Sequence, residues 1–159
     1  MTAFDTLLSL GGELNEAPRF PVEAPDGKRG WTELDRQAVF RQIMRNAAPA
    51  VLVYAVPNAG KRNPAQARKE GIMGGVFDLQ CWWRDRAPTE HNLVPFGTGF
   101  AAPEMKGYDS RGRAGRLSQA QIDWGNRMHD MGWPVACFFD PYAAVDWIRS
   151  LGAPVRALA

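Results

Sequence analysis

The chain has 159 residues, of which 45% are hydrophobic and 23% are charged. This length and balance predict one globular domain with a buried core, and they exclude wholesale disorder. The net charge of +2 indicates no particular partner. The longest nearly apolar stretch, residues 47–57, is too short to span a bilayer. Because the N-terminus also lacks the features of a secretory signal, we expect a soluble, cytoplasmic protein without a membrane partner.

The chain is expected to begin with an arm, residues 1–30, which is rich in glycine, proline and acidic residues. This arm packs either on the core or on a partner. The sequence from Trp31, WTELDRQAVFRQIMRNAA, predicts a helix, with Thr32 as its cap and Asp35 closing a capping box. The spacing of its apolar residues predicts an inward face. That face comprises Leu34, Ala38, Ile43, Met44 and Ala47.

The remaining elements follow in a simple order. Apolar, β-branched runs predict strands at residues 50–56, 76–83, 100–106 and 133–139. A helix capped by Ser118, with Gln121 at N3 and an apolar stripe ending at Met131, lies between the last two strands. Asp140 caps a final helix that has Pro141 at N1. The order helix, three strands, helix, strand, helix predicts a single α/β domain, residues 31–159, with a mixed and mostly buried sheet flanked by helices.

The third predicted strand ends in an acid and a base. Side chains alternate along a strand, so Glu104 and Lys106 share one face and Met105 occupies the other. Asp78 falls inside the second predicted strand, and a buried carboxylate is costly unless it is paired or binds a metal. Two carboxylates on adjacent strands could hold Mg²⁺, and Lys106 could stabilise a pentavalent phosphate, which suits phosphodiester hydrolysis. The alternative is a plain ion pair, with Asp78 capping a turn.

Two basic segments flank this pair of acids along the chain. Lysine and arginine there can neutralise backbone phosphates, although solvated loops have the same composition. The candidate nucleic-acid contacts are Lys61, Arg62, Arg68 and Lys69 before the second strand, and Arg111, Arg113 and Arg116 after the third.

Other chemistries are less well supported by the sequence. The stretch NAGKR resembles the end of a phosphate-binding loop, but Ala55 stands where the first glycine belongs and Arg62 where a serine or threonine belongs. Cys81 and Cys137 lie in separate apolar runs and are expected to be buried, inert thiols. His129 falls late in a helix, where a surface or packing role is expected.

Four segments in the order NAGKR, KEGIMGGVFDL, PEMKG and GRLSQAQ resemble the VRR-NUC family, the virus-type replication-repair nuclease domains of the PD-(D/E)xK superfamily. The resemblance covers about residues 32–151. It implies a restriction-endonuclease-like core with a mixed sheet. The chain departs from the family pattern at Phe77, where a proline is usual, and at Pro103, which removes a ladder hydrogen bond inside a strand.

The resemblance also implies the site. Asp78 and Glu104 match the family's metal ligands, and Lys106 matches its catalytic lysine. Gln121 matches the glutamine that orders the site. The implied metal is Mg²⁺ or Mn²⁺, with the Met105 carbonyl and Glu33 as further ligands. Glu33 and Gln37 share one helical face because they are four residues apart.

Several of these residues have alternative roles. Gln121 serves equally as a capping-box residue, and Glu33 as a first-turn acid favoured by the helix dipole. Trp82 and Trp83 could stack on bases, but core packing or a dimer face is the preferred interpretation.

The resemblance to stand-alone members of the family implies a homodimer that cuts branched DNA such as four-way junctions. The expected activity is therefore that of a divalent-metal-dependent endodeoxyribonuclease in a bacterial or phage setting. One alternative is a DNA-binding or assembly module that keeps the fold but cuts poorly. Another is an RNA or single-stranded substrate, because phosphate contacts carry little information on sugar or strand state.

Overall fold

A computed structural model of the chain describes residues 16–56, 65, 69–71, 73–84 and 98–157. The helices and strands of these residues follow the order α-β-β-β-α-β-α. They are α2 (Glu33–Ala47), β1 (Leu52–Ala55), β2 (Leu79–Arg84), β3 (Thr98–Met105), α4 (Gln119–Asp130), β4 (Val135–Phe138) and α5 (Pro141–Ser150). This order confirms the predicted α/β fold class and is consistent with a restriction-endonuclease-like core.

Within the described residues, the strands form one mixed sheet in the spatial order β1-β2-β3-β4. β2 is antiparallel to both β1 and β3, whereas β3 and β4 are parallel. A parallel pair needs a crossover connection, and α4 lies in the connection between β3 and β4. The mixed sheet is therefore the one that the sequence predicts.

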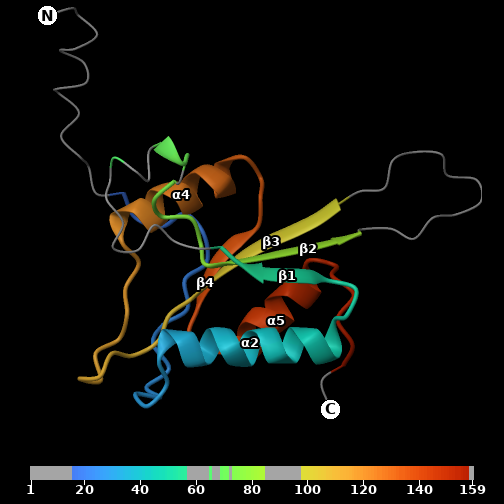
Figure 1. Ribbon diagram of the computed structural model, residues 1–159, viewed down its shortest axis with the longest axis horizontal. Coiled ribbons are helices and arrows are strands. Elements are labelled where there is room, and N and C mark those ends of the chain that lie inside the picture. Colours follow the sequence, from blue (N-terminus) through green and yellow to red (C-terminus); the bar gives the residue numbers. More distant parts are fainter. Residues whose placement is uncertain (1–15, 57–64, 66–68, 72, 85–97, 158–159) are drawn as a thin grey trace, which may run out of the picture.

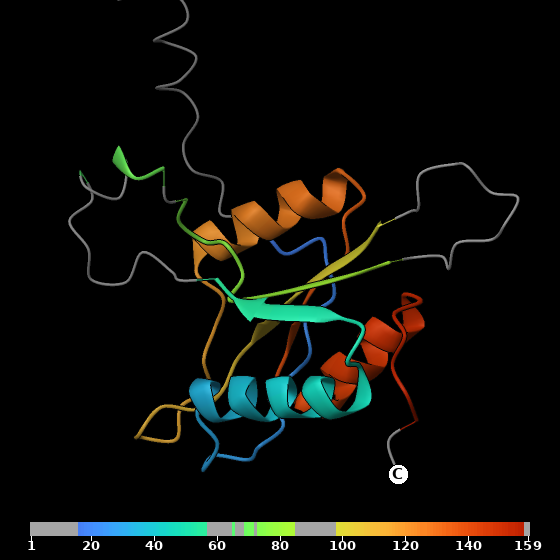
Figure 2. The same ribbon diagram turned by 45° about the vertical axis from the view of Figure 1, so that its right-hand side comes forward.

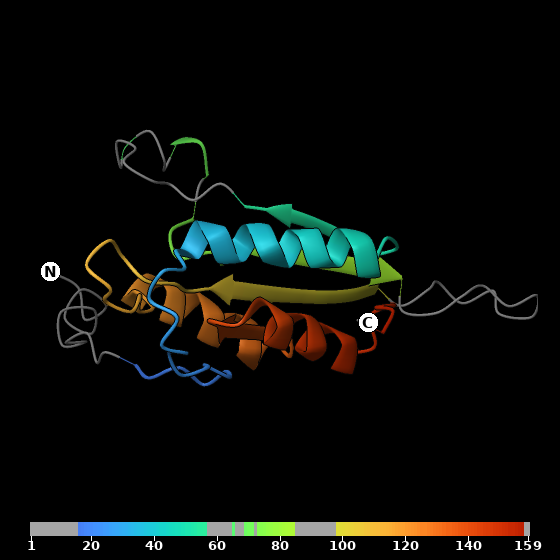
Figure 3. The same ribbon diagram turned by 90° about the horizontal axis from the view of Figure 1, so that it is seen from below.

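Helices cover both faces of the sheet (Figures 1 and 2). α2 and α5 lie side by side on one face, as the view from below also shows (Figure 3), and α4 covers part of the other. The larger core lies between the sheet and the α2–α5 pair, and it includes Leu79, Met105 and Ile148. A smaller core on the α4 side includes Phe77 and Phe100.

Local hydrogen bonds define where the helices begin. Thr32 and Asp35 form the predicted capping box at α2, and Ser118 and Gln121 form one at α4. Asp140 accepts a hydrogen bond from a backbone N–H in the first turn of α5. All these helix starts were predicted from the sequence, because capping depends on residues within one turn.

The predicted inward faces of two helices are partly wrong. Leu34 of α2 is 74% exposed and Met131, just after α4, is 64% exposed. Helix α2 buries Met44 and Ala47 as predicted, but it also buries Arg36, Gln37 and Phe40. The two polar side chains are stabilised in the interior by partners that are distant in sequence, so an apolar spacing pattern does not reveal that face.

Pro103 lies inside β3, next to the point where the partner of β3 changes from β2 to β4. β3 pairs with β2 through residues 98–101 and with β4 through residues 102–105. The N–H groups of Ala102 and Lys106 both donate to the β4 side. Position 103 therefore faces β2, beyond the last pair, Cys81 with Ala101. Proline has no N–H to donate there, so the β2–β3 ladder ends at this point, shortly before Glu104.

The described part of the arm, residues 16–30, packs on the core. Phe20 is buried, and Val22 forms an isolated parallel bridge with Cys137 of β4. The Glu23 N–H donates to the Cys137 carbonyl, and the Cys137 N–H donates to the Pro21 carbonyl, each at 2.9 Å. The arm therefore covers the edge of β4 that would otherwise present unpaired backbone groups.

Both cysteines are buried and free, as predicted. Desolvation by burial raises the pKa of the Cys81 thiol to about 12, and burial is also the largest cause that raises the pKa of Cys137 to about 12. Both thiols therefore stay protonated and unreactive near neutral pH.

Candidate metal centre

The end of β3 carries the predicted acid and base on one face. Glu104 is fully buried and Lys106 is 7% exposed. The Lys106 Nζ lies 2.7 Å from the Glu104 Oε1. Met105 points into the larger core on the opposite face, as strand alternation predicts. Its carbonyl as a metal ligand stays a prediction.

Asp78 reaches the same place from β2, although its predicted position inside a strand is wrong. It lies one residue before β2, which begins at Leu79. The register that pairs Cys81 with Ala101, extended by three residues, sets Asp78 opposite Glu104. The Asp78 N–H donates to the Glu104 Oε2 at 2.9 Å. The β2–β3 ladder has ended by this point, so the Asp78 N–H is available to the Glu104 carboxylate.

Helix α2 contributes a third carboxylate from its first turn. The Lys106 Nζ lies 3.5 Å from the Glu33 Oε2. One turn later, the Gln37 Nε2 donates to the Asp78 Oδ2 at 2.8 Å. The four-residue spacing of Glu33 and Gln37 thus places both side chains on one helical face, as predicted.

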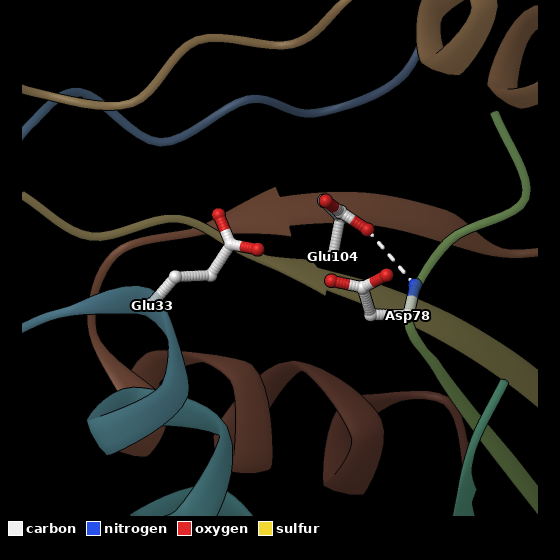
Figure 4. Close-up of side chains that lie close together, drawn as sticks. All are labelled: Glu33, Asp78 and Glu104. Atoms are coloured by element: carbon white, nitrogen blue, oxygen red, sulfur yellow. Dashed lines mark hydrogen bonds between the residues drawn. The ribbon is translucent and has the colours of Figure 1, made fainter. Parts of the chain in front are cut away.

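The three carboxylates converge from three separate elements (Figure 4). One oxygen atom each of Glu33, Asp78 and Glu104 lies within 4.8 Å of the other two. Hard divalent cations prefer such oxygen ligands. A cation would also offset the repulsion among three neighbouring acids, two of which, Glu33 and Glu104, contact the ammonium of Lys106. The donor set and its charge therefore fit a divalent metal ion.

Gln121 joins α4 to this centre and performs both of the roles considered for it. Its Oε1 accepts the Ser118 N–H at 3.0 Å, which completes the capping box. Its Nε2 donates to the Glu104 Oε1 at 2.5 Å. One amide therefore fixes the start of a helix and the orientation of a buried carboxylate.

Two glycines permit the close backbone approaches that assemble the site. A Cβ on Gly107 would lie 2.3 Å from the Glu33 nitrogen, at the start of α2. A Cβ on Gly75 would lie 2.0 Å from the Ala120 carbonyl oxygen in α4, and Gly75 also has a φ of 81°. Neither approach tolerates a side chain. Both glycines therefore set the distances between the elements that carry the acids.

Burial shapes the proton affinities of the site. Desolvation is the main cause that raises the pKa of Glu104 to about 7, with Lys106 lowering it and Asp78 raising it further. Desolvation also raises the pKa of Glu33. For Lys106, desolvation works to lower the pKa, but Glu104 and Glu33 outweigh it, so the pKa lies above its usual value. The ammonium is therefore charged at neutral pH.

The predicted basic contacts are only partly within the described residues. Lys61, Arg62 and Arg68 lie outside them. Lys69 is described and exposed. Arg111, Arg113 and Arg116 are exposed on a loop after β3, and Arg113 forms an ion pair with Asp109 at 2.6 Å.

The preferred alternatives for the other candidates agree with the structure. Trp83 is 5% exposed in the larger core, and Trp82 packs against Phe100 with ring centroids 4.5 Å apart. His129 is largely exposed beside Asp130. The tryptophans therefore serve packing, and the histidine lies at the surface.

Sequence reasoning missed a pair of residues that joins the arm to α2, Asp26 and Arg36. Arg36 is fully buried in α2, and its guanidinium donates to both carboxylate oxygens of Asp26 at 2.8 and 3.0 Å. The guanidinium also lies between the rings of Trp31, Tyr108 and Phe139. The only sequence signal is an acid ten residues before an arginine, which is too common to indicate a buried pair.

Comparison of the chain with protein-family models, with curated proteins and with solved structures gives no significant match. The candidate site is therefore described by its own geometry. Among the helices of the described residues, none has the length and apolarity needed to cross a bilayer.

Proposed function

We propose that this chain is a divalent-metal-dependent endonuclease that hydrolyses DNA phosphodiester bonds. The observation that carries the proposal is the convergence of Glu33, Asp78 and Glu104 within 4.8 Å, with the Lys106 ammonium against two of them. Acids that share one ammonium in a buried position form a costly arrangement without a further cation. A plain ion pair between Glu104 and Lys106 would need neither of the other two acids.

The proposed ligands are the carboxylates of Asp78, Glu104 and Glu33, with the Met105 carbonyl as a further candidate. A bound Mg²⁺ or Mn²⁺ would lower the pKa of a bound water molecule and screen negative charge on the phosphate. Gln37 and Gln121 each donate one hydrogen bond to a ligand carboxylate. These amides hold the ligand oxygens in place, as the outer partners of metal ligands do.

Lys106 acts in this proposal as a fixed positive charge. Its raised pKa keeps the ammonium protonated at neutral pH, so it is unsuited to accept a proton from water. An ammonium held at 2.7 Å by Glu104 is instead preorganised to stabilise negative charge that develops on a phosphoryl oxygen. Glu33 keeps 39% of its side chain accessible, which suits it to orient the attacking water.

Branched DNA as the substrate and a homodimer as the active form rest on the resemblance to the VRR-NUC family. The exposed edge strand β1 is compatible with a second copy, since Leu52 and Tyr54 are 63% and 41% exposed there. A dimer would set two active sites against two strands of one junction.

The test is cleavage of a labelled four-way junction by the wild type, by Asp78→Asn and by Lys106→Ala. Each protein is assayed with Mg²⁺, with Mn²⁺ and with EDTA, alongside linear duplex, single strands and RNA at one salt concentration. We expect metal-dependent cutting by the wild type and a loss of at least about a hundredfold in both variants, the range typical for a lost electrostatic contact in a transition state. Thermal melting of each variant confirms that it is folded.

Two outcomes would change the assignment. Tight junction binding without cutting under any condition would favour the DNA-binding or assembly module. Cutting by Asp78→Asn at the wild-type rate would show that the site assignment is wrong. Equal rates on all substrates would remove the junction preference alone.

A further inference from the structure

A groove of about 1030 Å³ opens beside the candidate metal centre. One wall is the start of α2, including Glu33 and Leu34, and the other is the loop after β3, including Arg113 and Arg116. Figures 1 and 2 show this loop, in yellow and orange, next to the blue arm and the start of α2. Because Glu33 belongs to both, the groove adjoins the candidate metal centre.

The loop that forms the outer wall is held by its own hydrogen bonds. Tyr108 and Ala114 form an antiparallel bridge across it. The Asp109 Oδ1 accepts the N–H groups of Arg111 and Arg113, each at 2.9 Å. The loop therefore presents its arginines from a defined backbone.

The two acids that line the groove, Glu33 and Asp109, already have cationic partners, Lys106 and Arg113. Asp109 is paired with Arg113 at 2.6 Å, and Asp26 is paired with the buried Arg36 at 2.8 Å. Within the described part of the chain, Arg29, Arg111 and Arg116 form no ion pair.

Arg29 comes from the arm and reaches this loop. A Cβ on Gly112 would lie 3.3 Å from the Arg29 Cδ, so the arginine side chain passes directly over the glycine. The arm and the loop thus bring Arg29 next to Gly112, between Arg111 and Arg113, although these segments are far apart in sequence.

We propose that this groove binds the sugar-phosphate backbone of the nucleic acid strand next to the scissile phosphate, with Arg29 and Arg116 neutralising its phosphates. The proposal deepens the nuclease function and rests on it. Three carboxylates at the metal centre repel an approaching phosphodiester, and guanidinium groups at the rim offset that repulsion. The exposed Leu34 in the opposite wall offers an apolar contact for a sugar.

The test measures binding, without cleavage, of a labelled four-way junction and a labelled single strand in EDTA over a range of NaCl concentrations. The variants are Arg29→Ala, Arg116→Ala and their combination. Each removed phosphate contact is expected to reduce the slope of log K against log salt by about 0.7 to 0.9 and to weaken binding uniformly over sequences. Arg29→Lys and Arg116→Lys keep the charge and should retain most of the wild-type slope.

Arg45→Ala is the matched control. Arg45 lies in the last turn of α2, whereas the groove is lined by the start of that helix. This variant should leave the slope unchanged. If Arg29→Ala and Arg116→Ala keep the wild-type slope, or if the wild type binds neither probe, the groove proposal is wrong.

The groove and the nuclease proposals can fail separately. Reduced slopes in the groove variants, with no metal-dependent cutting by the wild type, would support the groove and overturn the nuclease. Unchanged slopes, with cutting that Lys106→Ala abolishes, would support the nuclease and overturn the groove.

Discussion

Gln121 shows how one side chain can serve stability and the site at once, and substitutions can separate the two roles. Gln121→Glu keeps an acceptor for the capping box but places a carboxylate against Glu104 in place of the amide donor. We expect a loss of cleavage of about tenfold or more, because a hydrogen bond to a charged group contributes about 1.5–3 kcal/mol, and a loss of stability, because two carboxylates then meet in a buried position. Cleavage assays and thermal melting measure the two effects.

Ser118→Ala is the complementary variant. It removes the side-chain acceptor of the cap but leaves the amide of Gln121 next to Glu104. The unfolding free energy should fall by about 1 kcal/mol, with cleavage nearly unchanged. If Gln121→Glu cuts like the wild type, Gln121 has only a capping role.

The raised pKa of Glu104 predicts how stability depends on pH in the metal-free protein. Between the ordinary value of 4.5 and about 7, the folded state binds a proton that the unfolded state has released. The unfolding free energy should therefore fall as pH rises through this window. The effect is on the order of 3 kcal/mol, from about 1.4 kcal/mol per pKa unit.

Urea unfolding at a series of pH values in EDTA measures this dependence, and Glu104→Gln should flatten it. Saturating Mg²⁺ should flatten it as well, because a bound cation favours the charged carboxylate. The window between about pH 5 and 7 lies between the ordinary pKa of Glu104 and its pKa in the folded protein. If the stability of the wild type rises with pH in this window, Glu104 is not a buried acid with a raised pKa.

At the scale of elements, the approach of α2 to the end of β3 depends on Gly107. An alanine there would place its Cβ 2.3 Å from the Glu33 nitrogen and 2.4 Å from the Thr32 carbonyl carbon. The helix start must then shift and carry the Glu33 carboxylate away from Lys106. We expect a loss of stability of about 1–3 kcal/mol, as for overpacking, and reduced cleavage.

Gly30→Ala is the control, because an added Cβ at Gly30 meets no atom within 4 Å. Melting temperature and cleavage should both stay close to the wild type in this control. If Gly107→Ala also retains both, the distance between α2 and β3 does not determine the site.

The elements and most of the site could be predicted because their signals are local. The helix starts follow from capping residues, and the shared face of Glu104 and Lys106 follows from strand alternation. The position of Asp78 could be predicted only in part, since the start of β2 depends on where Pro103 ends the ladder. The partners of Arg36 and the groove rim could not be predicted, because they join the arm to α2 and to the loop after β3 through contacts between separate segments.

For the whole molecule, the Asp26–Arg36 pair couples the arm to the helix that carries Glu33 and Gln37. Arg36 is fully buried and also donates to the carbonyls of Lys28 and Phe139. Asp26→Ala leaves an uncompensated buried charge, which should lower the unfolding free energy by about 3–5 kcal/mol. The double variant Asp26→Ala, Arg36→Met should recover part of that loss, because it removes the charge as well as its partner.

Chemical unfolding of the wild type, both single variants and the double variant completes the cycle. The arm covers β4 and reaches the groove, so loss of the pair should also weaken nucleic acid binding. Asp26→Asn keeps hydrogen-bonding atoms, so it should lose less stability than Asp26→Ala. Asp35→Ala removes another carboxylate near the start of α2 that belongs to the capping box, and it should cost only about 1 kcal/mol. If Asp26→Ala is no more destabilising than Asp35→Ala, the arm is an appendage and does not hold the site together.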